Sequence, residues 1–152
     1  MTLRLDGEWH VGDSVDDLAQ FLHQEGADGY EAHEIRYSAC QACGSAVFGV
    51  EGSFEDPEDS VIADMFRRTC RSCGHQQYLA DSGEYWSEDH TFVSVCACGE
   101  EDFHIAVGFS LYADNMGIRS LAIATMCLAC GKLGILAEWM VRHNDMTLLD
   151  RS

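Results

Sequence analysis

The chain has 152 residues, of which 47% are apolar and 23% charged, and its formal net charge at pH 7 is −17. These fractions are typical of folded globular proteins and exclude wholesale disorder. A single proline and the lack of a sustained heptad exclude collagen-like and coiled-coil architectures. No apolar run approaches the roughly 20 residues that a membrane-spanning helix needs, so we expect no membrane partner.

The charge and the cysteine content bear on partners and compartment. The 26 acidic residues against 9 basic ones repel the phosphates of nucleic acids, which makes nucleic acid an unfavourable partner and a basic protein a favourable one. An acidic surface that only confers solubility is the alternative. Residues 1–7 lack the apolar segment and the cleavage site of a signal peptide, which predicts a cytoplasmic protein. In that reducing compartment, eight cysteines are more typical of metal ligands than of disulfides.

The N-terminal part of the chain is predicted to form a strand and a helix. Residues 7–11 are consistent with a short strand. Ser14 followed by Asp17 resembles a capping box, and apolar residues at helical spacing come next, so we expect a helix over 15–25. We expect this helix to pack on the first of the two repeats described below, with docking of its acidic face to a partner as the alternative. Alternating residues over 33–37 predict a strand that leads into the first cysteine pair.

Four close pairs of cysteines follow, each with a glycine directly after its second cysteine. The pairs are Cys40-x-x-Cys43-Gly44, Cys70-x-x-Cys73-Gly74, Cys96-x-Cys98-Gly99 and Cys127-x-x-Cys130-Gly131. Two thiolates on one tight turn can hold one tetrahedral zinc ion, and glycine leaves such a turn with positive φ at no steric cost. We therefore predict four zinc knuckles that supply two metal sites.

The knuckles also define an internal repeat, because 26 residues (44–69) separate the first two and 28 (99–126) separate the last two. Phe48 and Phe103 each lie five residues past a knuckle, at the start of an alternating pattern typical of a strand. Pairing within each repeat closes the shorter loops. This favours one site from Cys40, Cys43, Cys70 and Cys73 and a second from Cys96, Cys98, Cys127 and Cys130. Interleaved knuckles remain an alternative, as does a second site that is empty or recruits a histidine, for which His75 and His104 lie nearest.

Each half of the chain resembles a zinc ribbon, in which two cysteine knuckles clamp one zinc ion beneath a small antiparallel sheet. The tandem arrangement is similar to uncharacterised bacterial two-ribbon proteins. The resemblance covers about residues 37–86 and 93–142 and implies a structural four-cysteine zinc site in each half, two Zn²⁺ per chain. It departs from compact ribbons in its longer intervals and in the third knuckle, which is one residue short.

The expected fold class is therefore mostly β with one N-terminal helix and two tandem antiparallel β units. The expected segments are 1–36 (strand and helix), 37–92 (first repeat) and 93–152 (second repeat with a short tail). Strands buried on both faces are expected over 103–112 and 118–126, and a strand with one buried face over 133–141. Residues 81–90 link the repeats, with Tyr85 and Trp86 as anchors.

The remaining chemistry favours a protein that is not an enzyme. The only basic cluster, Arg67, Arg68 and Arg71, lies beside a knuckle, where thiolate neutralisation or surface exposure is more typical than phosphate binding. No hydrolase, phosphate-loop or metalloprotease motif occurs. The sequence thus predicts structural zinc and an acidic surface that binds another protein, for example as an inhibitor or immunity-type partner of a basic protein. A nucleic-acid accessory factor and a zinc-releasing redox switch are the alternatives, and iron could replace zinc.

Overall fold

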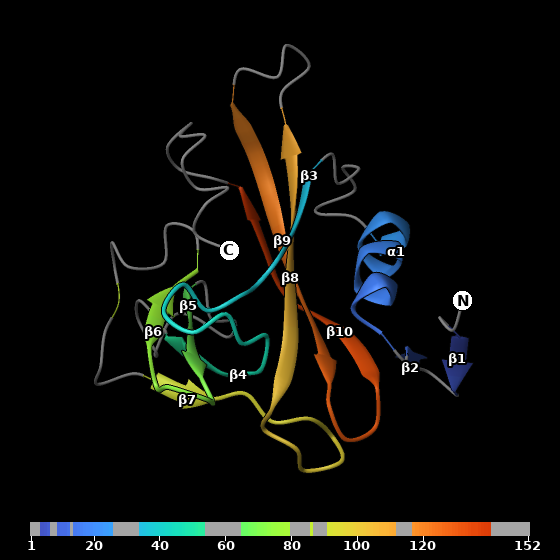
Figure 1. The fold of residues 1–152 in the computed structure, drawn as a ribbon. Coiled ribbons are helices and arrows are strands. Elements are labelled where there is room, and N and C mark those ends of the chain that lie inside the picture. The colour runs from blue at the N-terminus through green and yellow to red at the C-terminus, as the bar shows by residue number, and fades with distance from the viewer. Residues whose placement is uncertain are drawn as a thin grey trace.

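The computed structural model describes residues 4–6, 9–12, 14–25, 34–53, 65–79, 86, 91–111 and 117–140. Over these residues the chain forms one helix and a ten-stranded antiparallel sheet (Figure 1). The elements are β1 (Arg4–Asp6), β2 (Trp9–Val11), α1 (Val15–Glu25), β3 (Glu34–Tyr37), β4 (Phe48–Ser53), β5 (Met65–Cys70), β6 (Gln76–Tyr78), β7 (Thr91–Val93), β8 (Phe103–Leu111), β9 (Ile118–Cys127) and β10 (Lys132–Met140). The expected class, mostly β with one N-terminal helix, is confirmed.

The sheet follows the order β1-β2-β10-β9-β8-β4-β5-β6, and two further strands pair with its centre, β3 with β8 and β7 with β4. The predicted strands that precede the knuckles and those that follow them are therefore present. The long central strands β8 and β9 are buried along most of their length, as their apolar sequences predict. In the described part of the chain, no helix is long and apolar enough to cross a membrane.

The helix begins where the sequence predicts. The backbone N–H of Ser14 donates to Oδ2 of Asp17 at 3.2 Å, which satisfies a donor that the first helical turn would leave unpaired. Asp17 is buried, and Leu18 and Leu22 face the protein interior one turn apart. The apolar stripe therefore fixes the orientation of α1.

The prediction that α1 packs on the first repeat is wrong, because it contacts β8 and β9 of the second (Figure 1). Its apolar stripe meets three alanines of that sheet, Ala106, Ala122 and Ala124. The corresponding positions of the first repeat, counted from the knuckles, are Glu51, Met65 and Arg67. Small side chains let a helix approach the sheet closely, whereas an ion pair at the same place would have to be desolvated. The acidic face of α1 as a docking surface stays a prediction.

Both repeats have the same strand order and the same register. In each, a knuckle is followed by two paired strands, a second knuckle and a third strand, which gives β4-β5-β6 and β8-β9-β10. Phe48 lies opposite Cys70, and Phe103 lies opposite Cys127. The positional match seen in the sequence therefore extends to the pairing of the strands.

The two repeats meet at corresponding residues. Strands β4 and β8 pair in the antiparallel sense at Phe48 and Phe103, which are each five residues past a knuckle. An antiparallel pair between corresponding residues implies a local pseudo-twofold axis between them. The same transverse row of the sheet thus contains Cys70, Phe48, Phe103 and Cys127 in that order.

The strands that lead into the knuckles are exchanged between the repeats. Strand β3 enters the first knuckle but pairs with β8 of the second repeat, where Tyr37 lies opposite Ala106. Strand β7 enters the third knuckle but pairs with β4 of the first repeat, where Val93 lies opposite Glu51. These two pairs occupy corresponding positions, so the exchange is reciprocal. It has the form of a domain swap between two protomers, here within one chain.

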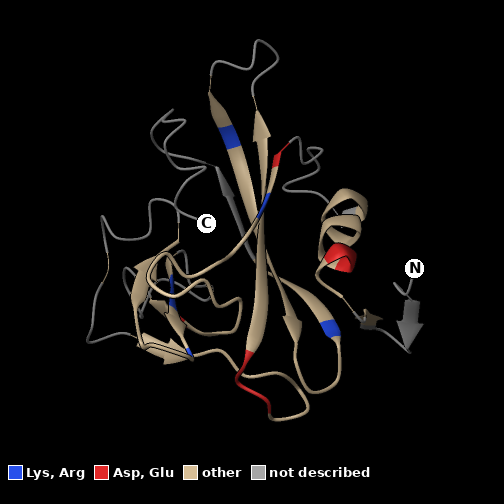
Figure 2. Cartoon of the chain, in the orientation of Figure 1, with Lys and Arg blue, Asp and Glu red and all other residues tan. Residues whose placement is uncertain are grey.

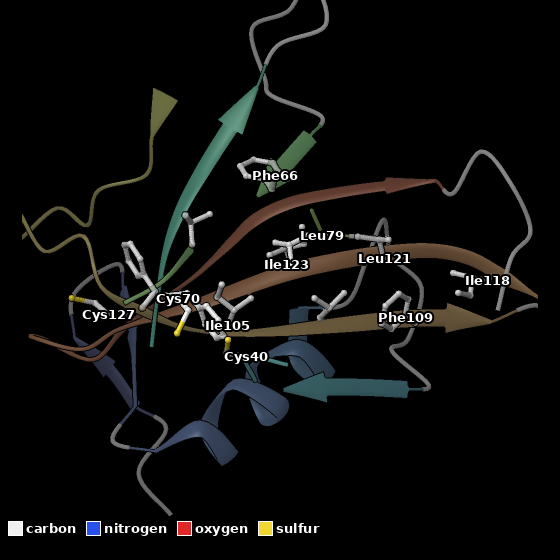
Figure 3. Close-up of a cluster of buried hydrophobic side chains, with 14 residues drawn as sticks. Cys40, Phe66, Cys70, Leu79, Ile105, Phe109, Ile118, Leu121, Ile123 and Cys127 are labelled. Atoms are coloured by element: carbon white, nitrogen blue, oxygen red, sulfur yellow. The ribbon is translucent and has the colours of Figure 1, made fainter. Parts of the chain in front are cut away.

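The exchange joins the predicted segments. Residues 34–37 and 91–93 make their sheet hydrogen bonds in the other repeat, and β2 pairs with β10. One buried cluster, drawn in Figure 3, takes side chains from both repeats and includes Cys40, Cys70 and Cys127. The division at 36/37 and 92/93 stays a prediction, and the sheet is continuous across both boundaries.

Two smaller expectations have mixed outcomes. The strand expected over 133–141 is present as β10, but Ile135 packs on the helix side while Leu136 packs on the other cluster, so both faces are covered. A register shift between Ile135 and Ala137 accompanies this. Trp86 does anchor the link between the repeats, since its ring lies 4.6 Å from the guanidinium carbon of Arg67. Tyr85 lies outside the described residues.

Candidate metal centres

The four knuckles are tight turns that each end in a glycine with positive φ. The φ angles are 80° at Gly44, 80° at Gly74, 96° at Gly99 and 75° at Gly131. A side chain would be strained in this left-handed region, which explains why glycine follows every pair. This expectation from the sequence is confirmed.

The shortened third knuckle closes by a tighter turn. In the first knuckle the N–H of Gly44 donates to the carbonyl of Cys40, four residues back, at 2.8 Å. In the third, the N–H of Gly99 donates to the carbonyl of Cys96, three residues back, at 2.8 Å. The third knuckle, which is one residue shorter, therefore closes a smaller hydrogen-bonded turn, and glycine still follows its second cysteine.

The knuckles bring the eight cysteines together in two groups of four. The first tetrad is Cys40, Cys43, Cys70 and Cys73, and the second is Cys96, Cys98, Cys127 and Cys130. Within each tetrad all sulfur atoms lie within 4.8 Å of one another. These are the groups expected for pairing within each repeat, and neither of the two clusters found among the described residues includes a histidine.

The sulfur–sulfur distances fit a tetrahedral metal ion. Cys40 Sγ lies 3.6 Å from Cys73 Sγ, and Cys43 Sγ lies 3.5 Å from Cys70 Sγ. In the second tetrad the matching distances are 3.6 Å each, from Cys96 to Cys130 and from Cys98 to Cys127. Four sulfurs at about 2.3 Å from a zinc ion are separated by about 3.8 Å, whereas a disulfide needs about 2.05 Å. Both tetrads therefore fit a metal ion such as zinc, and all eight cysteines are free thiols.

The two tetrads lie at the same level of the sheet. Cys70 and Cys127 are separated in their common row by Phe48 and Phe103, and three strand spacings place their Cα atoms about 14 Å apart. Figure 3 shows Cys40, Cys70 and Cys127 at one end of the buried cluster, with Ile118 and Leu121 toward the other. The pairing of β4 with β8 at Phe48 and Phe103 thus places both metal centres at one end of the core.

The thiols of the first tetrad have different pKa values, in part because backbone N–H groups donate hydrogen bonds to some of them more than to others. Burial raises the pKa of the Cys70 thiol, but hydrogen bonds from the N–H groups of Ser72 and Cys73 outweigh burial and lower this pKa to about 6. The N–H of Ser45 lowers the pKa of Cys43, yet its contact with Cys70 and the other thiols raises that pKa to about 12. A thiolate in the knuckle is thus stabilised by donors of the knuckle itself.

The thiols of the second tetrad also differ in pKa, but the lowered and raised values fall on other positions of the knuckles. The N–H of Glu100 lowers the pKa of Cys98 to about 7, and the contact with Cys127 acts in the same direction. Burial raises the pKa of Cys96 to about 12. The N–H of Ala129 lies 3.4 Å from Cys127 Sγ, although burial raises the pKa of that thiol. Each tetrad therefore combines at least one acidic thiol with thiols that keep their protons until a metal ion displaces them.

Arg68 places a buried cation beside the first tetrad. Its side chain is 2% exposed, and Nη2 donates to the carbonyl of Ala39 at 3.1 Å and to Oε1 of Gln77 at 3.0 Å. Burial lowers the pKa of this guanidinium, while attraction to Cys40 and Cys70 raises it. Of the roles expected for the basic cluster, thiolate neutralisation is the one that the position of Arg68 favours.

The other two arginines of the cluster bind acidic side chains within the protein. Arg67 pairs with Glu51 at 3.1 Å across β4 and β5. Arg71, in the second knuckle, pairs with Asp102, just past the third, at 2.7 Å. The latter ion pair ties the repeats together beside both tetrads. All three arginines thus have partners inside the protein.

The two candidate histidines serve other roles. Nδ1 of His104 lies 2.9 Å from the carbonyl of Ala46, a contact that links the start of β8 to the segment before β4. The carbonyl of His75 accepts a hydrogen bond from the N–H of Cys70 at 2.9 Å, and the residue is exposed. The sequence shows that both histidines lie near the knuckles along the chain, but it does not show the hydrogen bonds that they make.

Comparison with protein-family models, with curated proteins and with solved structures finds no match to this chain. The resemblance to zinc ribbons therefore depends on the knuckles and on the strand order described above. What is shown is a pair of four-cysteine clusters that fit metal ions.

Proposed function

We propose that this protein is a non-enzymatic zinc-binding protein whose two four-cysteine sites are structural. The observation that carries the proposal is the pair of tetrads with sulfur–sulfur distances of 3.5–3.6 Å. Four thiolates complete the coordination of a zinc ion and leave no position for a catalytic water. Structural zinc contributes roughly 10–16 kcal/mol of apparent binding free energy, which becomes folding free energy when the site forms only in the folded chain.

Zinc is the favoured ion because it accepts four thiolates in a tetrahedron without a redox change. Iron uses the same ligand set, so metal content must decide between them. Eight free thiols fit a reducing compartment, which supports a cytoplasmic location.

The binding role rests on charge. The net charge of −17 favours a basic partner. Among the described residues, acidic residues lie at the start of α1, where Asp16 is exposed, and on the segment before β8 (Figure 2). Because Arg67, Arg68 and Arg71 are all engaged internally, the one basic cluster in the sequence is not free to bind phosphate. A protein that covers a basic enzyme or a similar cationic target is the concrete form of this proposal.

Metal content of the natively purified protein tests the first part. Elemental mass spectrometry should find two zinc ions per chain, and about one in each of the Cys40→Ser and Cys96→Ser variants. Zinc that disappears entirely in Cys40→Ser but stays unchanged in Cys96→Ser would refute a site at the second tetrad. Iron in place of zinc would overturn the choice of metal.

Capture from cell lysate tests the second part. The holoprotein should retain a basic protein at low salt and release it as salt approaches 1 M, where the screening length falls to about 3 Å. A charge-reversed control should retain much less of it, for which Asp16→Lys and Glu101→Lys reverse two exposed acidic residues. Retention that is insensitive to both salt and these substitutions would contradict an electrostatic interface.

A further inference from the structure

A cavity lies beside the second tetrad, on the side of the sheet that carries Phe103. It has a volume of about 160 Å³, and its walls include Val95, Phe103, Thr125 and Gly134. Cavities of about 150 Å³ accept a group the size of benzene. The pseudo-twofold relation between the repeats allows this place to be compared with its counterpart in the first repeat.

In the first repeat the corresponding place is filled by Arg68. Its guanidinium carbon lies 4.5 Å from the ring centroid of Phe48, and its Nη2 donates to the carbonyl of Ala39 and to Gln77. The side chain thus stacks on the aromatic ring at the repeat interface and binds the strand that enters the knuckle. It does so next to Cys40 and Cys70, which attract it.

The second repeat keeps the walls of this place but lacks the arginine. Phe103 corresponds to Phe48, and Val95 corresponds to Ala39 directly before the first cysteine of the knuckle. Thr125, opposite Ile105, stands where the first repeat has Arg68 opposite Val50. The arginine side chain is therefore replaced by a much shorter one on the same face of the corresponding strand.

A second replacement enlarges the space. Gly134 lies opposite Thr125, as Gln77 lies opposite Arg68. A Cβ atom built on Gly134 would meet nothing within 4 Å. Ser94, directly after β7, also lines the cavity, and its hydroxyl is buried without a hydrogen-bond partner among the described atoms. Both members of the first repeat's Arg–Gln pair are thus missing. The unpartnered hydroxyl is common to both repeats, because Ser38, at the corresponding place in the first repeat, is also buried without a described partner.

The charge around the cavity favours a cation. Four thiolates with a divalent metal ion leave two negative charges at each tetrad, and only the first tetrad has a buried arginine at this position. The single lysine of the chain, Lys132, also lines this cavity. It corresponds to the exposed His75 of the first repeat, and it takes part in an interaction within the protein. A planar guanidinium can both stack on Phe103 and donate to main-chain carbonyls, as Arg68 does with Phe48 and Ala39 in the first repeat.

We propose that this cavity, lined by Val95, Phe103, Thr125 and Gly134, is a binding site for an arginine side chain of a basic protein partner. The partner's guanidinium takes the place that Arg68 takes in the first repeat, stacked on Phe103 and hydrogen-bonded to the strand before Cys96. This inference rests on the proposed binding function and specifies which side chain the partner inserts. The net charge of −17 supplies the long-range attraction, and the cavity supplies the specificity.

The test uses the metal-loaded full chain and a blocked tripeptide, acetyl-Gly-Arg-Gly-amide. Titration followed by backbone amide NMR should shift the signals of Val95, Phe103 and Gly134 with saturation. The citrulline peptide, which has the same shape but no charge, and the lysine peptide, which lacks the planar fork, should bind at least about tenfold more weakly. Equal binding of the arginine and citrulline peptides would overturn the proposal.

Variants of the cavity provide the second arm. Thr125→Arg with Gly134→Gln restores the pair of the first repeat and should abolish peptide binding while both metal ions stay bound. Thr125→Ala, the matched control, leaves the cavity open and should retain binding. If the arginine peptide binds only after Lys132→Gln, then Lys132 itself occupies the cavity and the proposal is wrong.

The outcome is separable from that of the proposed function. Two zinc ions per chain and salt-sensitive capture of a basic protein, with no arginine-peptide binding, would reject the cavity and leave the proposed function intact. Peptide binding blocked by the double variant, in a protein that captures no basic protein from lysate, would support the cavity and reject the wider electrostatic interface.

Discussion

Replacing Arg68 with methionine tests whether a buried cation supports the first tetrad. The guanidinium makes two hydrogen bonds, at 3.1 Å to Ala39 and 3.0 Å to Gln77. At about 1.5 kcal/mol for each bond from a charged donor, their loss destabilises the protein by about 3 kcal/mol. Methionine preserves most of the apolar contact with Phe48, so packing contributes little to this difference.

The effect on metal affinity should be confined to one site. Arg68 lies beside Cys40 and Cys70, and removal of such an outer-shell partner typically weakens metal binding by roughly 10–100-fold. Chelator competition on the cadmium-loaded protein, followed by cadmium NMR with one resonance for each tetrad, measures the two sites separately. We expect the first tetrad to lose its ion at lower chelator concentration and the second to be unchanged.

Arg67→Met is the matched control for this experiment. Arg67 precedes Arg68 on β5, so its side chain points to the opposite face, where it pairs with Glu51 and contacts Trp86. It should lower stability without a selective loss of metal at the first tetrad. Equal weakening of both tetrads by Arg68→Met, or the same selective loss in Arg67→Met, would refute the reasoning.

Three further predictions follow from the knuckles. Gly44→Ala should cost about 1–2 kcal/mol in thermal unfolding, since its φ is 80° and a Cβ there meets nothing within 4 Å. Gly131→Ala should lower the stability by more than this, because the added Cβ would collide with the carbonyl oxygen of Gly12. It should also expose the β2 amides to hydrogen exchange. An equal loss of stability in the two variants would contradict this prediction. Metal binding at pH 7 should release at least one proton per tetrad, because the pKa values of Cys43 and Cys96 are raised to about 12, so affinity must fall as pH falls. Calorimetry in buffers of different ionisation enthalpy measures the release, and a buffer-independent enthalpy would disprove it.

Much of the local structure follows from the sequence because its causes are local. The trailing glycines indicate turns with positive φ, and Ser14 with Asp17 indicates the start of α1. The spacing of Phe48 and Phe103 from their knuckles predicts equivalent strands, and the structure adds that these two residues are neighbours. Loop-closure entropy also favours the observed grouping of the cysteines.

The long-range arrangement could not be predicted in the same way. Alternation along β3 and β7 indicates which face of each strand is buried, but it does not indicate the strand with which each one pairs. The exchange depends on the free edges of β4 and β8 next to their contact at Phe48 and Phe103. The packing of α1 on the second repeat depends on small residues such as Ala122. Their importance is visible only when they are set beside the larger residues at the same positions of the first repeat.

That comparison separates what the two repeats share from what distinguishes them. The cysteines, the glycines and the central phenylalanines are shared, and these are the residues that a metal-stabilised sheet requires. Each face of the sheet carries one set of differences between the repeats. On one face, Glu51 and Arg67 of the first repeat give way to Ala106 and Ala124, and a helix covers them.

On the other face, Arg68 and Gln77 give way to Thr125 and Gly134, and a cavity results. The first difference has its compensation within the chain, because α1 buries the alanines. At the second, Gly134 leaves room for a larger side chain, and the lining includes one described basic residue, Lys132. The space that results borders the second tetrad, and it is the place where we propose that an arginine of a partner takes the role of Arg68.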